Sequence, residues 1–178
     1  MKHLGTKYLE TNRLILRKNV IEDAKMMFEN WASDSEVTKY LTWPTHTSVD
    51  ITKMILNSWI EEYSKDNFYQ WGIVLKETNE LIGSISVVNI NEEANSIEIG
   101  YCISRKHWNK GITTEALNRL INFFFEEAGV KKIYARHDQD NVASGKVMIK
   151  CGMKFVYTKE DRNNTNEKGI CKYYEIEK

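Results

Sequence analysis

The sequence is poor in the residues that mark several classes of protein. It has three cysteines and one proline, and its 25 Lys and Arg balance its 25 Asp and Glu. The cysteines form no CxxC pair and the four histidines show no ligand spacing, so we expect a reduced protein without a metal site. A net charge of zero gives no overall electrostatic reason to expect a nucleic acid or an anionic membrane as a partner.

Long hydrophobic runs are also absent. Residues 1–11 are polar and lack the apolar core of a signal peptide, and no stretch approaches the roughly 18 apolar residues of a membrane span. Hydrophobic residues make up 42% and charged residues 28% of the chain, a composition typical of folded rather than disordered proteins. Because no linker or repeat interrupts it, we expect one cytoplasmic domain over residues 1–178.

What is present is an alternation of strand and helix patterns. We expect strands over residues 12–17, 69–76, 81–89, 96–104, 131–137, 154–159 and 171–177, and helices over residues 22–31, 49–63, 111–128 and 141–151. Polar turns at 77–80 and 91–94 favour an antiparallel meander, and residues 160–169 form a polar loop. The order β-α-α-β-β-β-α-β-α-β-β predicts a mixed α/β fold with one central β-α-β unit.

Two of the expected helices carry apolar stripes. The first stripe contains Val49, Ile51, Ile55, Trp59, Ile60 and Tyr63, and the second contains Ala116, Leu117, Leu120, Ile121, Phe124 and Ala128. Three consecutive phenylalanines, Phe123, Phe124 and Phe125, cannot all lie on one face of a helix. We therefore expect one of them at a subunit contact, which favours a homodimer.

The segment that joins the strand ending at Ser104 to the next helix combines basic residues with a glycine: Arg105, Lys106, His107 and Lys110, then Gly111. The first amides of a helix have no internal partners, and with the helix dipole they form an anion site. Gly111 allows a diphosphate to approach the backbone, Asn109 tolerates a left-handed conformation, and Thr113 and Thr114 offer hydroxyl donors. An ordinary strand-to-helix turn has the same features, and the segment matches neither the Walker nor the GxGxxG pattern.

Four segments together resemble the GNAT acetyltransferases, particularly the branch that acetylates the N-termini of ribosomal proteins. They are residues 98–101 (Glu-Ile-Gly-Tyr), residues 108–116 (Trp-Asn-Lys-Gly-Ile-Thr-Thr-Glu-Ala), residues 141–144 (Asn-Val-Ala-Ser) with Val147, Lys150 and Gly152, and residues 11–17 (Thr-Asn-Arg-Leu-Ile-Leu-Arg). Their ordered combination spans nearly the whole chain and makes the resemblance specific.

The sequence also departs from the family pattern Q/R-x-x-G-x-G/A. Trp108 stands in the first place and Thr113 in the last, Asn109 replaces a glycine of the branch, and the central Gly111 is kept. Many members have a tyrosine general acid four residues before the glycine that corresponds to Gly152, whereas this chain has methionine there.

The resemblance implies direct transfer of an acetyl group from acetyl-CoA to a primary amine, without an acyl-enzyme. It implies that the pantetheine arm pairs with the strand around Tyr101 and that the phosphates bind the turn before the helix. The cofactor-binding residues implied in this way are Tyr101, Cys102, Ile103, Trp108, Asn109, Lys110, Gly111, Ile112, Thr113, Thr114, Asn141 and Ser144.

Acyl transfer to an amine needs a general base and benefits from a general acid. Glu98 is the favoured base, acting directly or through a water, because a carboxylate within an apolar strand is desolvated and accepts a proton more readily. A solvent-facing or ion-paired residue is an equally good interpretation of Glu98. His137 is a second candidate base, although a histidine with satisfied hydrogen bonds at a strand end is the better interpretation.

Ser144 is the favoured general acid. Asn141 can cap the helix that starts there, which places Ser144 in its first turn, and the resemblance implies a serine acid at this position. A polar residue that contacts the backbone at a helix start is the alternative. Asn141 likewise is either a cap or a cofactor contact.

The acceptor is the open question. Trp43, beside the single Pro44, is expected to wall the acceptor pocket, together with residues 38–47, the second long helix and the loop 160–169, whereas Trp59 and Trp71 are expected in the core. A peptide or ribosomal-protein N-terminus, an antibiotic, a polyamine and a free amino acid all satisfy the chemistry. A non-catalytic module that binds CoA or a protein partner on the same fold is the alternative function.

Overall fold

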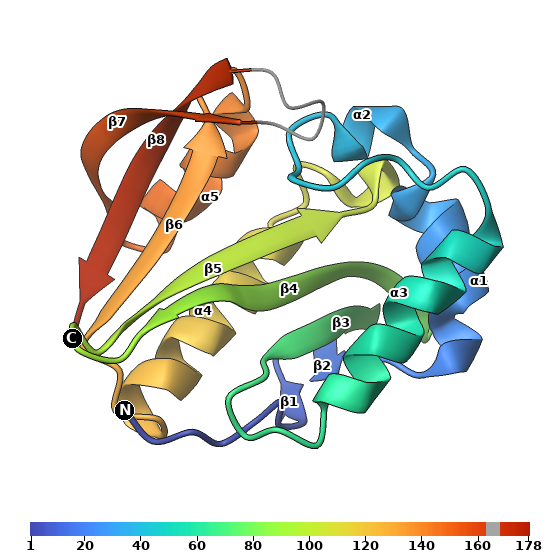
Figure 1. The fold of residues 1–178 in the computed structure, drawn as a ribbon, viewed down its shortest axis with the longest axis horizontal. Helices are drawn as coiled ribbons and strands as arrows, with labels where there is room; N and C mark the ends of the chain where they lie inside the picture. The colour runs from blue at the N-terminus through green and yellow to red at the C-terminus, as the bar shows by residue number, and fades with distance from the viewer. Residues whose placement is uncertain (163–167) are drawn as a thin grey trace.

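The computed structural model describes residues 1–162 and 168–178, and these residues form one mixed sheet covered by helices on both faces (Figure 1). The strand order in the sheet is β1-β2-β3-β4-β5-β6-β8-β7. The strands are β1 Leu9–Glu10, β2 Leu14–Arg17, β3 Gln70–Leu75, β4 Glu80–Asn91, β5 Ser96–Ile103, β6 Lys132–Asp138, β7 Lys154–Arg162 and β8 Lys168–Glu177.

The hydrophobic core has two parts, one on each face of the sheet, and helices cover both. They are α1 Ala24–Met27, α2 Ser35–Thr38, α3 Val49–Glu62, α4 Ile112–Glu126 and α5 Val142–Lys150. Buried side chains of α4 and α5 join those of the central strands in one hydrophobic cluster, and buried side chains of α1 and α3 form a second cluster on the other face. The predicted mixed α/β fold is confirmed, with β5-α4-β6 as the central parallel unit.

Two predicted elements differ from the structure. The helix expected over residues 22–31 is a 3-10 turn, the short α1 and a wide π turn over Phe28–Ala32, in which Asn30 donates to the carbonyl of Leu81 (2.7 Å) on β4. The prediction of a loop over residues 160–169 is wrong at both ends, because β7 and β8 continue there. Glu160 pairs with Ile170, and Asp161 pairs with Gly169. The middle of that loop, residues 163–167, lies outside the described residues.

The apolar stripe predicted for α3 is confirmed for Val49 and Trp59, which pack against the second cluster, and wrong for its three isoleucines. Thr52 and Leu56 are fully buried, whereas Ile51, Ile55 and Ile60 are 37%, 36% and 37% exposed. Thr52 reaches the buried surface because its hydroxyl is 2.8 Å from Nδ1 of His46. Thr52, with this buried partner, therefore lies on the inward face of the helix together with Leu56.

The stripe of α4 is confirmed, since all six of its predicted residues are buried. The expectation for the three phenylalanines is wrong, because Phe123, Phe124 and Phe125 are exposed by only 0%, 1% and 8%. The sheet covers one side of α4, and the start of the chain covers more of it, with Met1 and Leu4 packed against the same cluster. The observation that favoured a homodimer is therefore removed.

The sheet splits in its middle. β5 and β6 pair in parallel only through Ser96–Glu98 and Lys132–Tyr134, and beyond these residues the two strands diverge (Figure 1). β6 stays paired with β8 along its whole length, and β5 stays paired with β4. The backbone of β5 from Ile99 onward therefore presents to the split an edge that no described strand pairs.

Candidate active site

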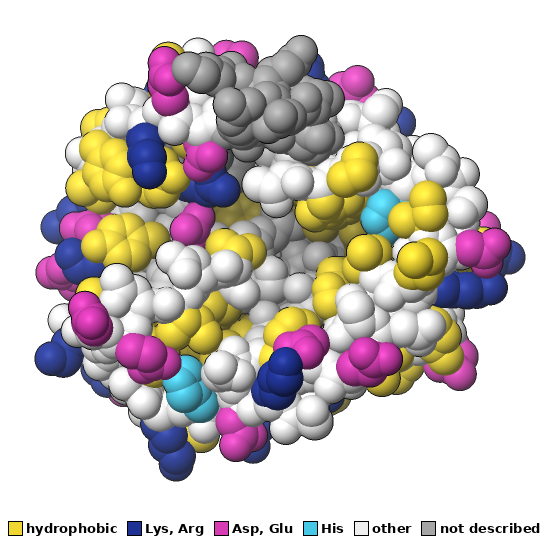
Figure 2. Space-filling view, viewed as in Figure 1, with side chains coloured by type: hydrophobic (Ala, Val, Ile, Leu, Met, Phe, Trp, Pro, Cys, Tyr) yellow, Lys and Arg dark blue, Asp and Glu magenta, His cyan; other side chains and the backbone are white. Residues whose placement is uncertain are grey.

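A cavity of about 300 Å³ lies at the split, and residues from both faces of β5 line it. The surface is hollowed near the middle of the face shown in Figure 2. Four groups of residues line the cavity: the segment before α3 (Tyr40, Leu41, Thr42, Trp43), Trp59 of α3, the floor formed by β3, β4 and β5 (Gln70, Ser84, Ser86, Val88, Glu98, Gly100), and the far side (Arg136, His137, Asp138, Asn141, Ser144, Asp161). Trp59, expected in the core, packs against the second hydrophobic cluster and also lines the cavity, as does Trp43.

The turn before α4 has the geometry of an anion site. Asn109 and Gly111 both have left-handed backbones, with φ of 60° and 72°. Gly111 is the cap residue of α4, and no side chain caps the helix there. The amides of its first turn are therefore left for solvent or a ligand.

A brace ties this turn to the start of the sheet. The Glu115 carboxylate accepts hydrogen bonds from the Thr11 hydroxyl (2.5 Å) and from the Arg13 backbone (2.9 Å) and guanidinium (2.6 Å). Arg13 also donates to the carbonyl of Lys110 (3.0 Å). Burial opposes ionisation of Glu115, but these hydrogen bonds outweigh it and lower its pKa. Two of the segments that carry the resemblance, residues 11–17 and 108–116, are therefore joined through Thr11, Arg13 and Glu115.

Trp108 links the turn to the end of β5. Its indole N–H donates to the carbonyl of Ile103 (3.0 Å), and 40% of the residue is exposed. Lys110 and Gly111 beyond it are exposed. The side chain of Trp108, in the first place of the motif, therefore holds the turn against the end of β5, and the turn itself stays exposed.

A tyrosine–serine pair lies where the split meets α5. The Tyr101 hydroxyl is 2.9 Å from Oγ of Ser144 and 3.1 Å from its carbonyl oxygen. Asn141 caps α5 by accepting from the Ser144 amide (3.3 Å), as the sequence predicts. Burial raises the pKa of Tyr101, so its hydroxyl stays protonated. Sequence reasoning considered only the backbone of Tyr101; the alternation of β5 with Ile97, Ile99 and Ile103 was the signal that its side chain faces α5.

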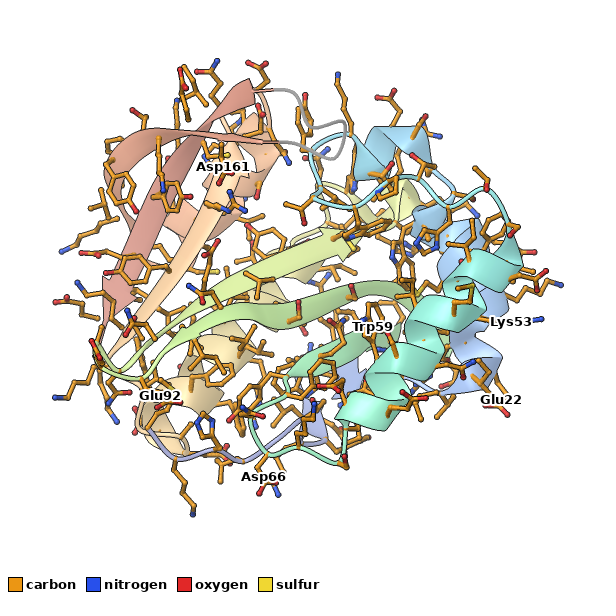
Figure 3. All side chains as sticks on the ribbon, viewed as in Figure 1. Glu22, Lys53, Trp59, Asp66, Glu92 and Asp161 are labelled. Carbon is orange, nitrogen blue, oxygen red and sulfur yellow. The ribbon has the colours of Figure 1, made fainter. Side chains whose placement is uncertain are left out.

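An ion-pair network lies on the opposite face of the split. Nε of Arg136 is 3.0 Å from a Glu98 oxygen, and Nη1 of Arg136 pairs with Asp161 of β7. The Glu98 side chain is 19% exposed and lines the cavity. Figure 3 shows Trp59 on the side of α3 that faces the sheet, and Asp161 beyond the split. Glu98 is therefore an ion-paired residue that lines the cavity, as the second of its two interpretations predicts, and its role as a base stays a prediction.

His137, the second candidate base, is buried and neutral. Burial lowers its pKa, and its Nδ1 donates to the carbonyl of Asp138 (2.7 Å). Nε2 has no hydrogen-bond partner among the described residues and lies against Gly145, where an added Cβ would come within 2.5 Å of it. Close packing on α5 therefore fixes this ring.

The arrangement of the described residues favours neither a cysteine nucleophile nor a metal site. Cys102 and Cys151 are buried, and burial raises the pKa of Cys151 to about 12, which keeps it a thiol. No group of three or more His, Cys, Asp or Glu side chains in residues 1–162 and 168–178 is arranged to hold a metal ion. Within the same residues no helix is long and apolar enough to cross a membrane.

The sequence pattern of the acetyltransferase (GNAT) domain matches residues 13–154. The chain belongs to the GNAT acetyltransferase family. A relative among known proteins is the uncharacterised N-acetyltransferase p20 of Bacillus licheniformis, which is 36% identical over 144 residues that cover 79% of this chain and 78% of p20. This GNAT protein is thus an acetyl-CoA-dependent N-acetyltransferase.

Solved structures have the same fold. A GNAT acetyltransferase from Bacillus anthracis superposes with a TM-score of 0.83 at 27% identity, covering 96% of this chain and 98% of that one. The ribosomal-protein-S5-alanine acetyltransferase of Vibrio fischeri gives a TM-score of 0.82 at 18% identity, with 96% of both chains covered. At this identity the second likeness concerns the fold alone.

Proposed function

We propose that this GNAT enzyme acetylates a primary amine held in the cavity, with the cofactor arm in the split between β5 and β6. The observation that carries the proposal is that one cavity is lined by Tyr101 and Ser144 on one face of the split and by Glu98 on the other. A donor that passes through the split and an acceptor on the α3 side would meet between these groups.

Two features of the chain fit acetyl-CoA. The uncapped first turn of α4, with left-handed Asn109 and Gly111, suits a diphosphate, and the exposed Lys110 adds positive charge. The unpaired edge of β5 around Tyr101, Cys102 and Ile103 offers backbone donors and acceptors in the spacing of a strand, which suits the amides of a pantetheine arm.

The proposed reaction uses backbone amides of β5 and a few side chains. Bound acetyl-CoA supplies the acetyl group as a thioester, and β5 amides donate to the oxygen on which negative charge develops. Glu98 accepts the amine proton, directly or through a water, while Arg136 holds the carboxylate in orientation. Ser144 donates a proton to the departing sulfur.

Tyr101 prepares Ser144 for this step. The tyrosine has one hydroxyl hydrogen, and the Ser144 carbonyl oxygen can only accept. When Tyr101 donates to that carbonyl, the Ser144 hydrogen points back at the tyrosine. When Tyr101 donates to Oγ instead, the Ser144 hydrogen is available for the sulfur; Ser144 then regains a proton from solvent water, and Tyr101 keeps its own.

The acceptor in this proposal is a primary amine of a peptide N-terminus or a small molecule. The Vibrio fischeri neighbour is named as an acetyltransferase of an alanine in ribosomal protein S5, which makes a ribosomal N-terminus one acceptor to test. An amine with a bulky planar or apolar group fits the aromatic wall formed by Trp43 and Trp59.

Calorimetry and thermal shift with acetyl-CoA test the cofactor part of the proposal. We expect binding in the micromolar range and a raised melting temperature. Absence of both heat and shift would overturn the proposal. Binding without thiol release across a broad amine panel would instead favour the non-catalytic module.

A further inference from the structure

Val88 of β4 lines the cavity from a β-bulge. The pairing of β4 with β5 shifts there, so that Val88 lies between the residues paired with Ile99 and Glu98 and has no partner of its own on β5. Bulges re-aim a side chain and are common next to active sites. Val88 is 58% exposed, so a ligand in the cavity can contact its methyl groups.

Val88 borders the space over Gly100 of β5. A Cβ added to Gly100 would lie 3.0 Å from Cγ1 of Val88. Apart from the two chain neighbours of Gly100, no other atom of the described residues lies within 4 Å of that point. Gly100 also lines the cavity. A ligand group that lies over Gly100 therefore meets Val88 on the β4 side and open space elsewhere.

Glu98, the proposed base, lies next along the same face of β5. Side chains two residues apart in a strand point to the same face, and their Cα atoms lie roughly 7 Å apart. The strand order β4-β5-β6 puts Val88 on one side of this face and Arg136 on the other, where Arg136 pairs with Glu98 (3.0 Å). The space beside the carboxylate is thus bounded by a cation towards β6 and by valine methyl groups towards β4.

We propose, resting on the proposed function, that Val88 is a specificity-determining residue that selects against branched acceptors. The amine lies beside Glu98, and the carbon that bears it lies over Gly100 in contact with Val88. A methyl branch on that carbon meets the valine, so the enzyme prefers amines borne by a CH2 group. The selection acts on the branch, and it applies equally to a peptide N-terminus and to a small amine.

Two sets of acceptors test the selection, because the members of each set differ only by a methyl group on the carbon that bears the amine. The sets are glycinamide with L- and D-alaninamide, and benzylamine with the two enantiomers of 1-phenylethylamine. Thiol release is measured with saturating acetyl-CoA at equal concentrations of unprotonated amine. One hydrogen of the CH2 group faces Val88, so the enantiomer that replaces it should have a kcat/KM about 10-fold below that of the unbranched amine. Equal use of all three members of a set would overturn the inference.

Val88→Ala tests the role of the side chain. Removing its two methyl groups should bring kcat/KM for the poorer enantiomer close to that for the unbranched amine, whereas Val88→Thr keeps the branched shape and should keep the difference. Val156→Ala is the matched control, because Val156 is also an exposed valine at a bulge, between β7 and β8, and is not among the described residues that line the cavity. A ratio unchanged in Val88→Ala, or changed equally in Val156→Ala, would overturn the inference.

Failure of this inference can be told apart from failure of the proposed function. If branched and unbranched amines release thiol equally well, acetyl transfer stands and Val88 does not select. If neither set is used but another primary amine is, the comparison of that amine with its homologue methylated on the same carbon decides. If acetyl-CoA binds and no amine of any class releases thiol, both proposals fall.

Discussion

The turn before α4 and the cavity beneath α3 are built differently. In the turn, side chains brace the backbone, with Glu115 held by Thr11 and Arg13 and Trp108 bonded to the carbonyl of Ile103, although Nδ1 of His107 has no partner among the described residues. The turn is thus braced by bonds from side chains to the backbone, whereas the cavity lining includes a donor, Nε2 of Gln70, and an acceptor, Nε2 of neutral His137, without partners among the described residues.

The largest expected effect is on turnover, at the place where the two regions meet. Ser144→Ala should lower kcat about 100-fold while the dissociation constant of acetyl-CoA stays within a factor of two, because the hydroxyl acts on the departing sulfur. Tyr101→Phe should lower kcat about 10-fold by the same route. Rapid thiol-release assays and calorimetry separate the two quantities.

Controls for this pair are Ser64→Ala and Tyr8→Phe, both at exposed positions. Neither should change kcat. A loss of acetyl-CoA binding in Ser144→Ala comparable to its loss of kcat would make Ser144 a cofactor contact instead of an acid.

The second effect tests the turn alone. Gly111→Val puts a β-branched residue at a φ of 72°, so we expect acetyl-CoA binding to weaken about 10- to 100-fold by calorimetry. Gly129→Val is a matched control, because Gly129 ends the same helix at a φ of 68° with nothing within 4 Å of an added Cβ. Both variants should lose stability, and only the first should lose binding. Equal binding losses would mean that α4 is merely destabilised.

A smaller effect is expected when the hydrogen bonds of Glu115 with Thr11 and Arg13 are weakened. Glu115→Gln keeps the shape of the side chain and removes its charge, so KM for acetyl-CoA should rise about threefold with kcat unchanged. Glu127→Gln on the same helix, where the distance to Arg119 is 3.8 Å, should change neither value. An effect of Glu115→Gln on the amine KM rather than the acetyl-CoA KM would break the division between the two regions.

The smallest effect concerns acid stability. Burial lowers the pKa of His46 and of His137 below the ordinary 6.5. Below pH 6.5 the unfolded chain therefore binds protons that the native chain does not, and stability rises with pH in this range. Chemical denaturation should show the free energy of unfolding falling slightly from pH 7 to pH 5.5. His46→Gln should flatten this slope, and an unchanged slope would contradict the burial of a neutral His46.

The two regions also differ in how far the sequence predicts them. The left-handed turn at Asn109 and Gly111, the stripe of α4 and the Asn141 cap depend on neighbours in the chain, and they could be predicted. The Tyr101–Ser144 pair and the contact of Arg136 with Asp161 join distant segments, which local patterns do not encode. The burial of all three phenylalanines likewise depends on the start of the chain reaching back over α4.

Thiol release tests the central claim most directly. The protein is mixed with acetyl-CoA and glycinamide, free thiol is followed over time, and the mass of the acceptor is measured at the end. The account predicts thiol release that depends on both substrates, together with an acetylated amine. Thiol release without an acetylated acceptor, or none with any amine although acetyl-CoA binds, would contradict it.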